Sequence, residues 1–163
     1  MRTDYPHHLP AFDYTGFYRY FLTFCTEKRA RLLVDDDTVD LVWTQFLRAA
    51  SGENMAILAC VFMPDHVHLV TEGEAEDTDL KRFISRAKQL SGYHYAQSKG
   101  SRLWQRYGYE HLLRDEEPTR ATLAYVLENP VRAKLVETVW DHPYIRSSKY
   151  DREDLIEYVY RSG

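Results

Sequence analysis

The 163-residue sequence has little cysteine, no long apolar run and no excess of positive charge. Its two cysteines, Cys25 and Cys60, lie inside apolar segments, which favours buried reduced thiols over a disulfide. No stretch approaches the roughly 20 apolar residues of a membrane span, and the first residues lack the apolar core of a signal peptide. We expect a single cytoplasmic domain spanning residues 1–163, with a core at about residues 15–150 and peripheral segments at 1–14 and 151–163.

Charge is unevenly distributed along the chain. The formal net charge of −4 does not by itself indicate a nucleic-acid binder. Residues 72–79 hold five acids and no base, whereas residues 81–114 hold eight bases and one acid, Glu110. Tyrosines and a tryptophan interleave with these bases, and this combination suits phosphates and unstacked bases. A solvated amphipathic helix with some core aromatics is the alternative.

Apolar patterning predicts four strands and four helices. The strands are expected at residues 17–26, 55–62, 66–71 and 109–114. Helices are expected after the capping residues Asp35 and Asp79, between about residue 116 and Asn129-Pro130, and near residues 151–160. The order of strands and helices predicts an α+β fold, in which helices pack on one face of an antiparallel sheet.

Two histidines stand out in the segment Cys60-Val61-Phe62-Met63-Pro64-Asp65-His66-Val67-His68-Leu69-Val70. Pro64 and Asp65 are turn formers, so the two apolar flanks predict a hairpin. Side chains of a strand repeat with a period of two, so His66 and His68 share one face. Burying two neutral imidazoles in an apolar strand costs free energy unless they bind something. A divalent metal ion is what such a histidine pair most commonly binds.

Tyr125 and Asn129 are four residues apart on the predicted late helix and so share one face. Asn129 can offer an amide oxygen to a metal, or it can simply end the helix before Pro130. The Tyr125 phenol can act as a nucleophile if a metal, a base or a positive field activates it, or it can be an ordinary core aromatic. A metal held by His66, His68 and Asn129 would polarise a phosphate oxygen and favour attack at phosphorus.

Three stretches together resemble the single-tyrosine transposases with a histidine-hydrophobe-histidine (HUH) motif. They are Phe62 to Leu69, Leu103-Trp104-Gln105-Arg106-Tyr107-Gly108-Tyr109-Glu110-His111, and Tyr125-Val126-Leu127-Glu128-Asn129-Pro130-Val131-Arg132. The last two narrow the resemblance to the REP-associated tyrosine transposases. The similarity covers roughly residues 10–150.

The resemblance implies a ferredoxin-like core whose central strand carries His66 and His68. It implies Tyr125 as the nucleophile, and Asn129 as the third ligand of a Mg²⁺ or Mn²⁺ ion. The reaction would cleave and rejoin single-stranded DNA through a 5′-phosphotyrosine link, on hairpins of repetitive extragenic palindromes. It also implies a monomer that uses its own tyrosine rather than a helix-swapped dimer.

Six basic side chains are candidate DNA contacts: Lys81, Arg82, Arg86, Lys88, Arg106 and Arg114. Trp104 and Gln105 are expected to be a packing anchor and a local hydrogen-bonding group. Two other functions fit the same residues. One is a domesticated DNA-binding protein that no longer cuts, and the other is a metal-dependent phosphodiester hydrolase.

Overall fold

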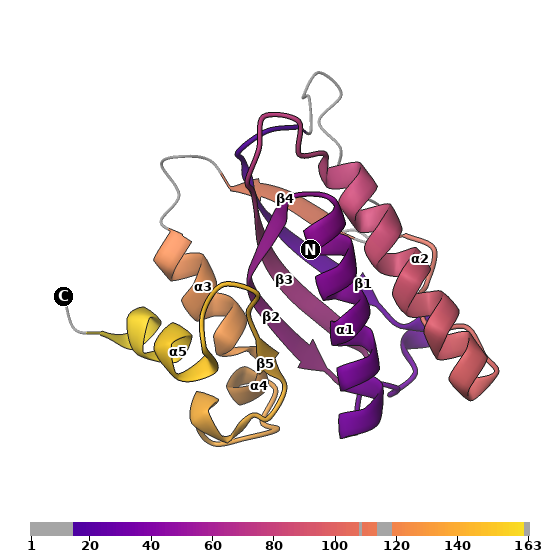
Figure 1. Ribbon diagram of the computed structural model, residues 1–163. Coiled ribbons are helices and arrows are strands. Elements are labelled where there is room, and N and C mark those ends of the chain that lie inside the picture. The colour runs from indigo at the N-terminus through magenta and orange to yellow at the C-terminus, as the bar shows by residue number, and fades with distance from the viewer. Residues whose placement is uncertain (1–14, 108, 114–118, 162–163) are drawn as a thin grey trace.

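A five-stranded antiparallel sheet forms the centre of the molecule. The computed structural model describes residues 15–107, 109–113 and 119–161 (Figure 1). The strand order is β4-β1-β3-β2-β5, so β3 is the middle strand. The strands are β1 (Arg19–Cys25), β2 (Met55–Met63), β3 (His66–Gly73), β4 (Tyr109–Leu113) and β5 (Ile145–Arg146). The predicted α+β class, and the central position of the strand that carries both histidines, are confirmed.

Strands β2 and β3 form the predicted hairpin. Met63 pairs with His66, which leaves Pro64 and Asp65 as the two turn residues. Every residue of β2 is buried. A continuous apolar run of this kind is typical of a strand that is covered on both faces, so elements on both sides of the sheet must pack against β2.

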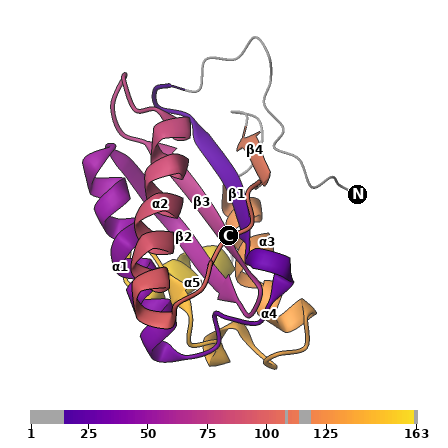
Figure 2. The ribbon, with the colours of Figure 1, turned by 90° about the vertical axis from the view of Figure 1, so that its right-hand side faces the viewer.

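Two long helices cover one face of the sheet, side by side (Figure 2). They are α1 (Asp36–Gly52) and α2 (Leu80–Lys99). The side chain of Asp35 caps α1 by accepting from the Thr38 N–H, and that of Asp79 caps α2 by accepting from the Arg82 N–H, as the sequence predicts. No described helix is long and apolar enough to cross a membrane.

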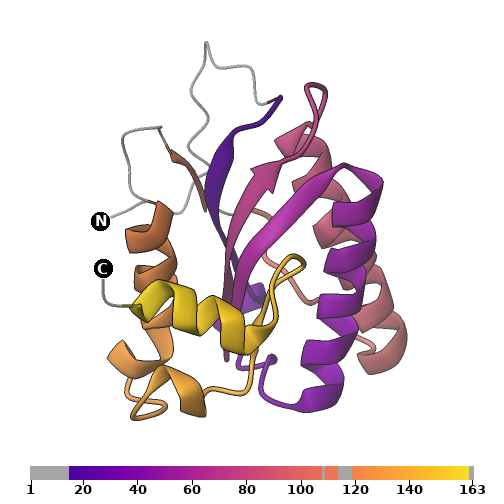
Figure 3. The ribbon, with the colours of Figure 1, turned by 60° about the vertical axis from the view of Figure 1, so that its left-hand side comes forward.

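The opposite face is also covered, so the expectation that helices pack on one face alone is wrong. Helices α3 (Thr119–Leu127) and α5 (Arg152–Tyr160) lie there, with α3 against β2 and β3 (Figure 3). Their buried side chains join those of β2 in a second core that includes Leu123, Val126 and Ile156. The fully apolar sequence of β2 requires this second layer, because either face left open would expose large apolar side chains.

The C-terminal segment belongs to this second core and is not peripheral. Leu155 and Ile156 of α5 are fully buried, and Arg120 of α3 donates hydrogen bonds to the carbonyls of Val159 and Arg161. Strand β5, which the sequence does not predict, pairs with β2 at Cys60 and Val61. With two residues, β5 is too short to produce a recognisable alternating pattern.

Candidate active site

His66 and His68 lie side by side on the face of the sheet that α3 covers. Their ring centroids are 4.7 Å apart, and both side chains are half-buried. Val67, between them, is fully buried in the core under α1 and α2. The alternation along β3 therefore produces the shared face that the sequence predicts.

Each imidazole is held through its Nδ1 atom. His66 Nδ1 lies 2.7 Å from Asp65 Oδ1, and His68 Nδ1 lies 2.9 Å from Thr23 Oγ1 on the neighbouring strand β1. An ionised carboxylate only accepts, so His66 Nδ1 must carry the proton. No described residue hydrogen-bonds to either Nε2, so both atoms are open to another ligand. His66 Nε2 carries a lone pair, and His68 Nε2 carries one when its Nδ1 donates to Thr23 Oγ1.

Both imidazoles are held neutral. The pKa of His68 is lowered to about 3, mainly by burial, with smaller contributions in the same direction from the neighbouring His66 and the charges of Arg132 and Arg29. Burial also lowers the pKa of His66, although its hydrogen bond to Asp65 opposes the shift. Burial raises the pKa of Asp65, but the hydrogen bond from His66 and the Arg29 charge outweigh this, so its net pKa is lowered. Neutral imidazoles next to an ionised carboxylate are the protonation states that metal binding requires.

Tyr125 lies over the same face, in the same chain. Its ring packs edge-on against Phe21 of β1 at 6.4 Å between centroids, and Phe21 in turn lies 5.3 Å from the ring of His68. The Tyr125 side chain is 56% exposed, so a large substrate can reach it. The structure thus brings the helix of the tyrosine and the strand of the histidines together, as the resemblance implies.

Arg132 places a cation against the tyrosine ring. Its guanidinium lies 4.0 Å from the centre of the Tyr125 ring, and its Nη2 donates a 2.8 Å hydrogen bond to the Tyr125 carbonyl. That carbonyl lies in the last turn of α3, where helix carbonyls lack intrahelical partners. Arg132 therefore caps the helix and stacks on the nucleophile candidate at the same time.

The sequence predicts one helix through both Tyr125 and Asn129, but α3 ends at Leu127 and Asn129 begins the short helix α4 (Asn129–Arg132). Its side chain is half-buried, and no described residue accepts from or donates to its amide group. Among the described residues, no three His, Cys, Asp or Glu side chains gather in a metal-binding group. A metal at the two Nε2 atoms would therefore draw its remaining ligands from a neutral oxygen such as that of Asn129, from water or from the substrate. The donor chemistry of the residues fits such an ion.

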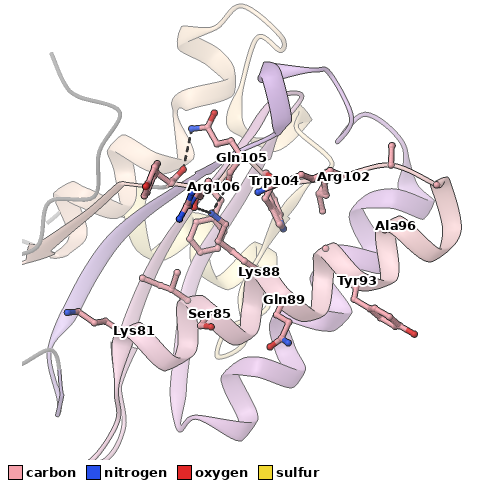
Figure 4. A pocket seen from close by; sticks show the side chains of 17 residues that line it. Lys81, Ser85, Lys88, Gln89, Tyr93, Ala96, Arg102, Trp104, Gln105 and Arg106 are labelled. Carbon is pink, nitrogen blue, oxygen red and sulfur yellow. Dashed lines mark hydrogen bonds between the residues drawn. The ribbon is translucent and has the colours of Figure 1, made fainter.

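A groove of about 920 Å³ lies beside α2, between this helix and residues 100–107 (Figure 4). Its floor includes Phe24, which follows Thr23 on β1 and so points to the opposite face of the sheet. The described residues that line the groove include no Asp or Glu, and four of them are cations: Lys81, Lys88, Arg102 and Arg106. Tyr93 and Tyr107 are exposed at the groove.

The six candidate DNA-binding residues separate into groups. Lys81, Lys88 and Arg106 line the groove, and Lys88 Nζ donates a 2.9 Å hydrogen bond to the Gln105 carbonyl. Arg82 and Arg86 point toward α1, where both pair with Glu53 at 3.3 and 3.7 Å. Arg114 lies outside the described residues.

Trp104 and Gln105 have the structural roles that the sequence predicts. Trp104 is buried, stacks on Phe46, and donates from Nε1 to Ser91 Oγ at 2.8 Å. The Gln105 side chain donates to the Tyr107 carbonyl.

The sequence does not identify Thr23, Arg29 or Arg132 as parts of the site. Each comes from a different segment, and only strand register and helix packing bring them to the histidines. The alternation of β1, once paired with β3, is the one signal that could have indicated Thr23.

Comparisons with known proteins agree with this geometry. Residues 17–129 match the family model described as "Transposase IS200 like". The chain is 25% identical over 143 residues to a Haemophilus influenzae protein named "Putative REP-associated tyrosine transposase", and the match covers 81% of each. The resemblance that the sequence motifs indicate is therefore confirmed.

Two solved structures have similar folds. One, described as a REP-associated tyrosine transposase bound to a REP hairpin, superposes with a TM-score of 0.70 at 21% identity, covering 85% of this chain and 81% of that one. The other, described as a "putative transposase" from Deinococcus radiodurans, has a TM-score of 0.52 at 23% identity, covering 75% of this chain and 97% of that one. At these identities the similarity establishes the fold.

Proposed function

Because the chain belongs to the family of IS200-like transposases, we propose that it is a metal-dependent enzyme that cuts and rejoins single-stranded DNA through Tyr125. The observation that carries the proposal is the assembly on one face of the sheet. Two neutral histidines, whose Nε2 atoms have no described hydrogen-bond partner, lie on the same face as an exposed tyrosine of the same chain. The Phe21 ring packs between that tyrosine and His68.

In the proposed reaction, Tyr125 Oη attacks the phosphorus of a phosphodiester. The phenol gives up its proton to solvent as the Oη–P bond forms. The bond from phosphorus to the 3′-oxygen breaks, and that oxygen takes up a proton from solvent and leaves as a 3′-hydroxyl. The product is a 5′-phosphotyrosine. Attack by a 3′-hydroxyl on this link reverses the step and joins two strands without an external energy source.

The residues of the site have distinct roles in this scheme. A Mg²⁺ or Mn²⁺ ion, when bound by His66, His68 and Asn129, would polarise a phosphate oxygen. Arg132 holds the tyrosine ring and supplies positive charge over its face. Phe21 separates Tyr125 from His68 and supports both rings. Since all these residues come from one chain, a monomer is sufficient to form the site.

The groove beside α2 is the proposed contact for the DNA backbone. Its cations and exposed tyrosines suit phosphates and unstacked bases, although the molecule as a whole is acidic. One solved relative of similar fold is described as bound to a REP hairpin. We therefore expect the substrate of this chain to be a hairpin with a single-stranded segment at its foot.

The test is to trap the covalent intermediate. A labelled hairpin with a single-stranded foot is incubated with the protein and Mn²⁺, and denaturing electrophoresis detects the adduct. We expect the Tyr125→Phe variant to form no adduct. Tyr158→Phe is a matched control, because Tyr158 is 49% exposed and also carries a cation over its ring, from Arg120.

Each other outcome points to a different nucleophile or a different function. An adduct that survives Tyr125→Phe would move the nucleophile to another residue. Metal-dependent cleavage without any adduct would favour a phosphodiester hydrolase. Binding without cleavage by the wild-type protein would favour an inactive DNA-binding protein.

A further inference from the structure

Asp65 connects His66 to a cation on a different segment. One carboxylate oxygen, Oδ1, lies 2.7 Å from His66 Nδ1. The other, Oδ2, accepts from Arg29 Nε at 3.1 Å and lies 3.0 Å from Arg29 Nη2. Both oxygens are thus engaged, and the carboxylate cannot rotate without breaking one of these contacts.

The backbone around Arg29 is shaped to make this contact. Lys28 and Arg29 both have φ of +54°, a left-handed conformation that is unfavourable for residues with a Cβ atom. The Thr26 N–H donates to the Asp65 carbonyl at 3.0 Å, and the Leu33 N–H donates to the Pro64 carbonyl at 3.0 Å. These bonds tie the segment from Thr26 to Leu33 to the hairpin turn that precedes His66. Unfavourable backbone conformations persist where the surroundings enforce them, and they cluster at functional sites.

We propose that Asp65, held by Arg29, is a positioning residue that fixes His66 as the Nδ1–H tautomer, so that Nε2 is presented as the metal ligand. This inference rests on the proposed function, since it assigns a role within the proposed metal site. A metal-ligating imidazole needs its other nitrogen oriented by a partner, and a carboxylate is a strong partner of this kind.

The second histidine provides an internal comparison. The partner of His68 is the Thr23 hydroxyl, which can donate or accept and so does not select a tautomer. His66 therefore depends on Asp65 for its tautomer, whereas His68 is held in orientation only. Removal of the carboxylate should affect the His66 ring alone.

The first experiment reads the tautomer in the metal-free protein. Long-range ¹H–¹⁵N NMR spectra at neutral pH distinguish protonated from unprotonated ring nitrogens. We expect His66 in the wild type to be protonated at Nδ1, and Asp65→Ala to shift it toward the Nε2–H form. Asp65→Asn retains an oxygen that can accept, so it should restore the wild-type tautomer. Arg31→Ala, an exposed change two residues from Arg29, is the control.

The second experiment measures Mn²⁺ affinity directly, from the electron paramagnetic resonance signal of free Mn²⁺. We expect Asp65→Ala to weaken binding by about 10- to 100-fold. Arg29→Ala should weaken Mn²⁺ binding less than Asp65→Ala does, because Asp65 keeps its contact with His66 and loses only its contact with Arg29. His66→Ala gives the Mn²⁺ affinity expected when the metal-binding side chain itself is removed.

The outcomes separate this inference from the proposed function. If the wild type binds Mn²⁺ but Asp65→Ala has the same tautomer and the same affinity, then the inference is overturned and the metal site stands. If the wild type does not bind Mn²⁺ at all, then the proposed metal site fails first and the inference fails with it. The inference is supported if Asp65→Ala loses Mn²⁺ affinity and changes the His66 tautomer, and if Asp65→Asn recovers the wild-type tautomer.

Discussion

His66 and His68 have the same side chain but different partners, a carboxylate and a hydroxyl. Their shared face could be predicted from the sequence, because it follows from the period of two along a single strand. Their partners could not be predicted in the same way. Thr23 reaches His68 only through the register of β1 against β3, and Arg29 reaches Asp65 only through a left-handed turn of two non-glycine residues.

Arg132 provides a prediction for a single residue next to the nucleophile candidate. We expect Arg132→Ala to slow formation of the DNA adduct by about tenfold, which corresponds to an increase of roughly 1.4 kcal/mol in the activation free energy. The reason is that the variant loses both the stack on the Tyr125 ring and the cap on its carbonyl. The measurement is the rate of adduct formation with Mn²⁺ in excess.

Arg132→Lys is the matched variant, because it keeps the charge but not the planar stack. It should recover part of the rate. A wild-type rate in Arg132→Ala, in a protein with an unchanged melting temperature, would show that the guanidinium does not position Tyr125.

His142 provides a prediction for acid sensitivity. It is buried and donates from Nε2 to the Phe62 carbonyl at 2.8 Å. Burial lowers the pKa of His142, and the charges of Arg152 and Arg146 lower it further. The unfolded chain therefore binds a proton below pH of about 6.5 that the folded state excludes, so stability falls as the pH decreases through this value.

Denaturant titrations at pH 7, 6 and 5 measure this effect. His142 should contribute a decrease of at most about 1.4 kcal/mol per pH unit to the free energy of unfolding. His142→Gln can still donate to Phe62 but does not titrate, so its stability should fall less steeply. Parallel pH profiles for the two proteins would contradict the assignment.

Elements were predicted more completely than their arrangement. The four predicted strands, the hairpin at Pro64 and the caps at Asp35 and Asp79 are present, because each depends on residues close together in sequence. The placement of α3 and α5 on the second face of the sheet was missed, although the unbroken apolar run of β2 indicates burial on both sides. This placement matters for function, since α3 carries Tyr125.

Helix α5 is expected to support α3 through the second core. Ile156 is fully buried there, whereas its neighbour Glu157 is exposed. We expect Ile156→Ala to lower the free energy of unfolding by about 2–5 kcal/mol, because it leaves a cavity in an apolar core. Glu157→Ala should change it by less than about 0.5 kcal/mol.

Chemical denaturation of the two variants is the measurement. Equal stabilities would mean that the burial of Ile156 does not stabilise the fold. A loss confined to Ile156→Ala would establish α5 as part of the folded unit that holds the tyrosine helix.

The candidate active site and the cationic groove lie on opposite faces of the central sheet. The histidines and Tyr125 lie on the face under α3, and the cationic groove lies on the side of α1 and α2. The sequence predicts the basic segment, but it does not predict which of the basic side chains line the groove and which pair with an acid. Only the packing of α2 against α1 assigns Arg82 and Arg86 to Glu53, and Lys81 and Arg106 to the groove.

This division predicts different effects on DNA binding. In Arg102→Ala plus Arg106→Ala, the slope of log affinity against log salt concentration should fall by about 1.4–1.8, if each of these groove cations neutralises one phosphate. Arg82→Ala plus Arg86→Ala should reduce the slope less, because the shared Glu53 carboxylate already offsets part of their charge. Fluorescence anisotropy of a labelled hairpin over a range of salt concentrations measures both slopes, and equal slopes would remove the distinction.

The most direct test of the central proposal is to locate the covalent bond to DNA. Trypsin releases residues 121–132 as a single peptide in which Tyr125 is the only tyrosine. The adduct formed with Mn²⁺ is digested with nuclease and trypsin, and tandem mass spectrometry then identifies the modified residue. We predict a nucleotide phosphate on Tyr125. A phosphate on any other tyrosine, or on none, would contradict the proposed mechanism.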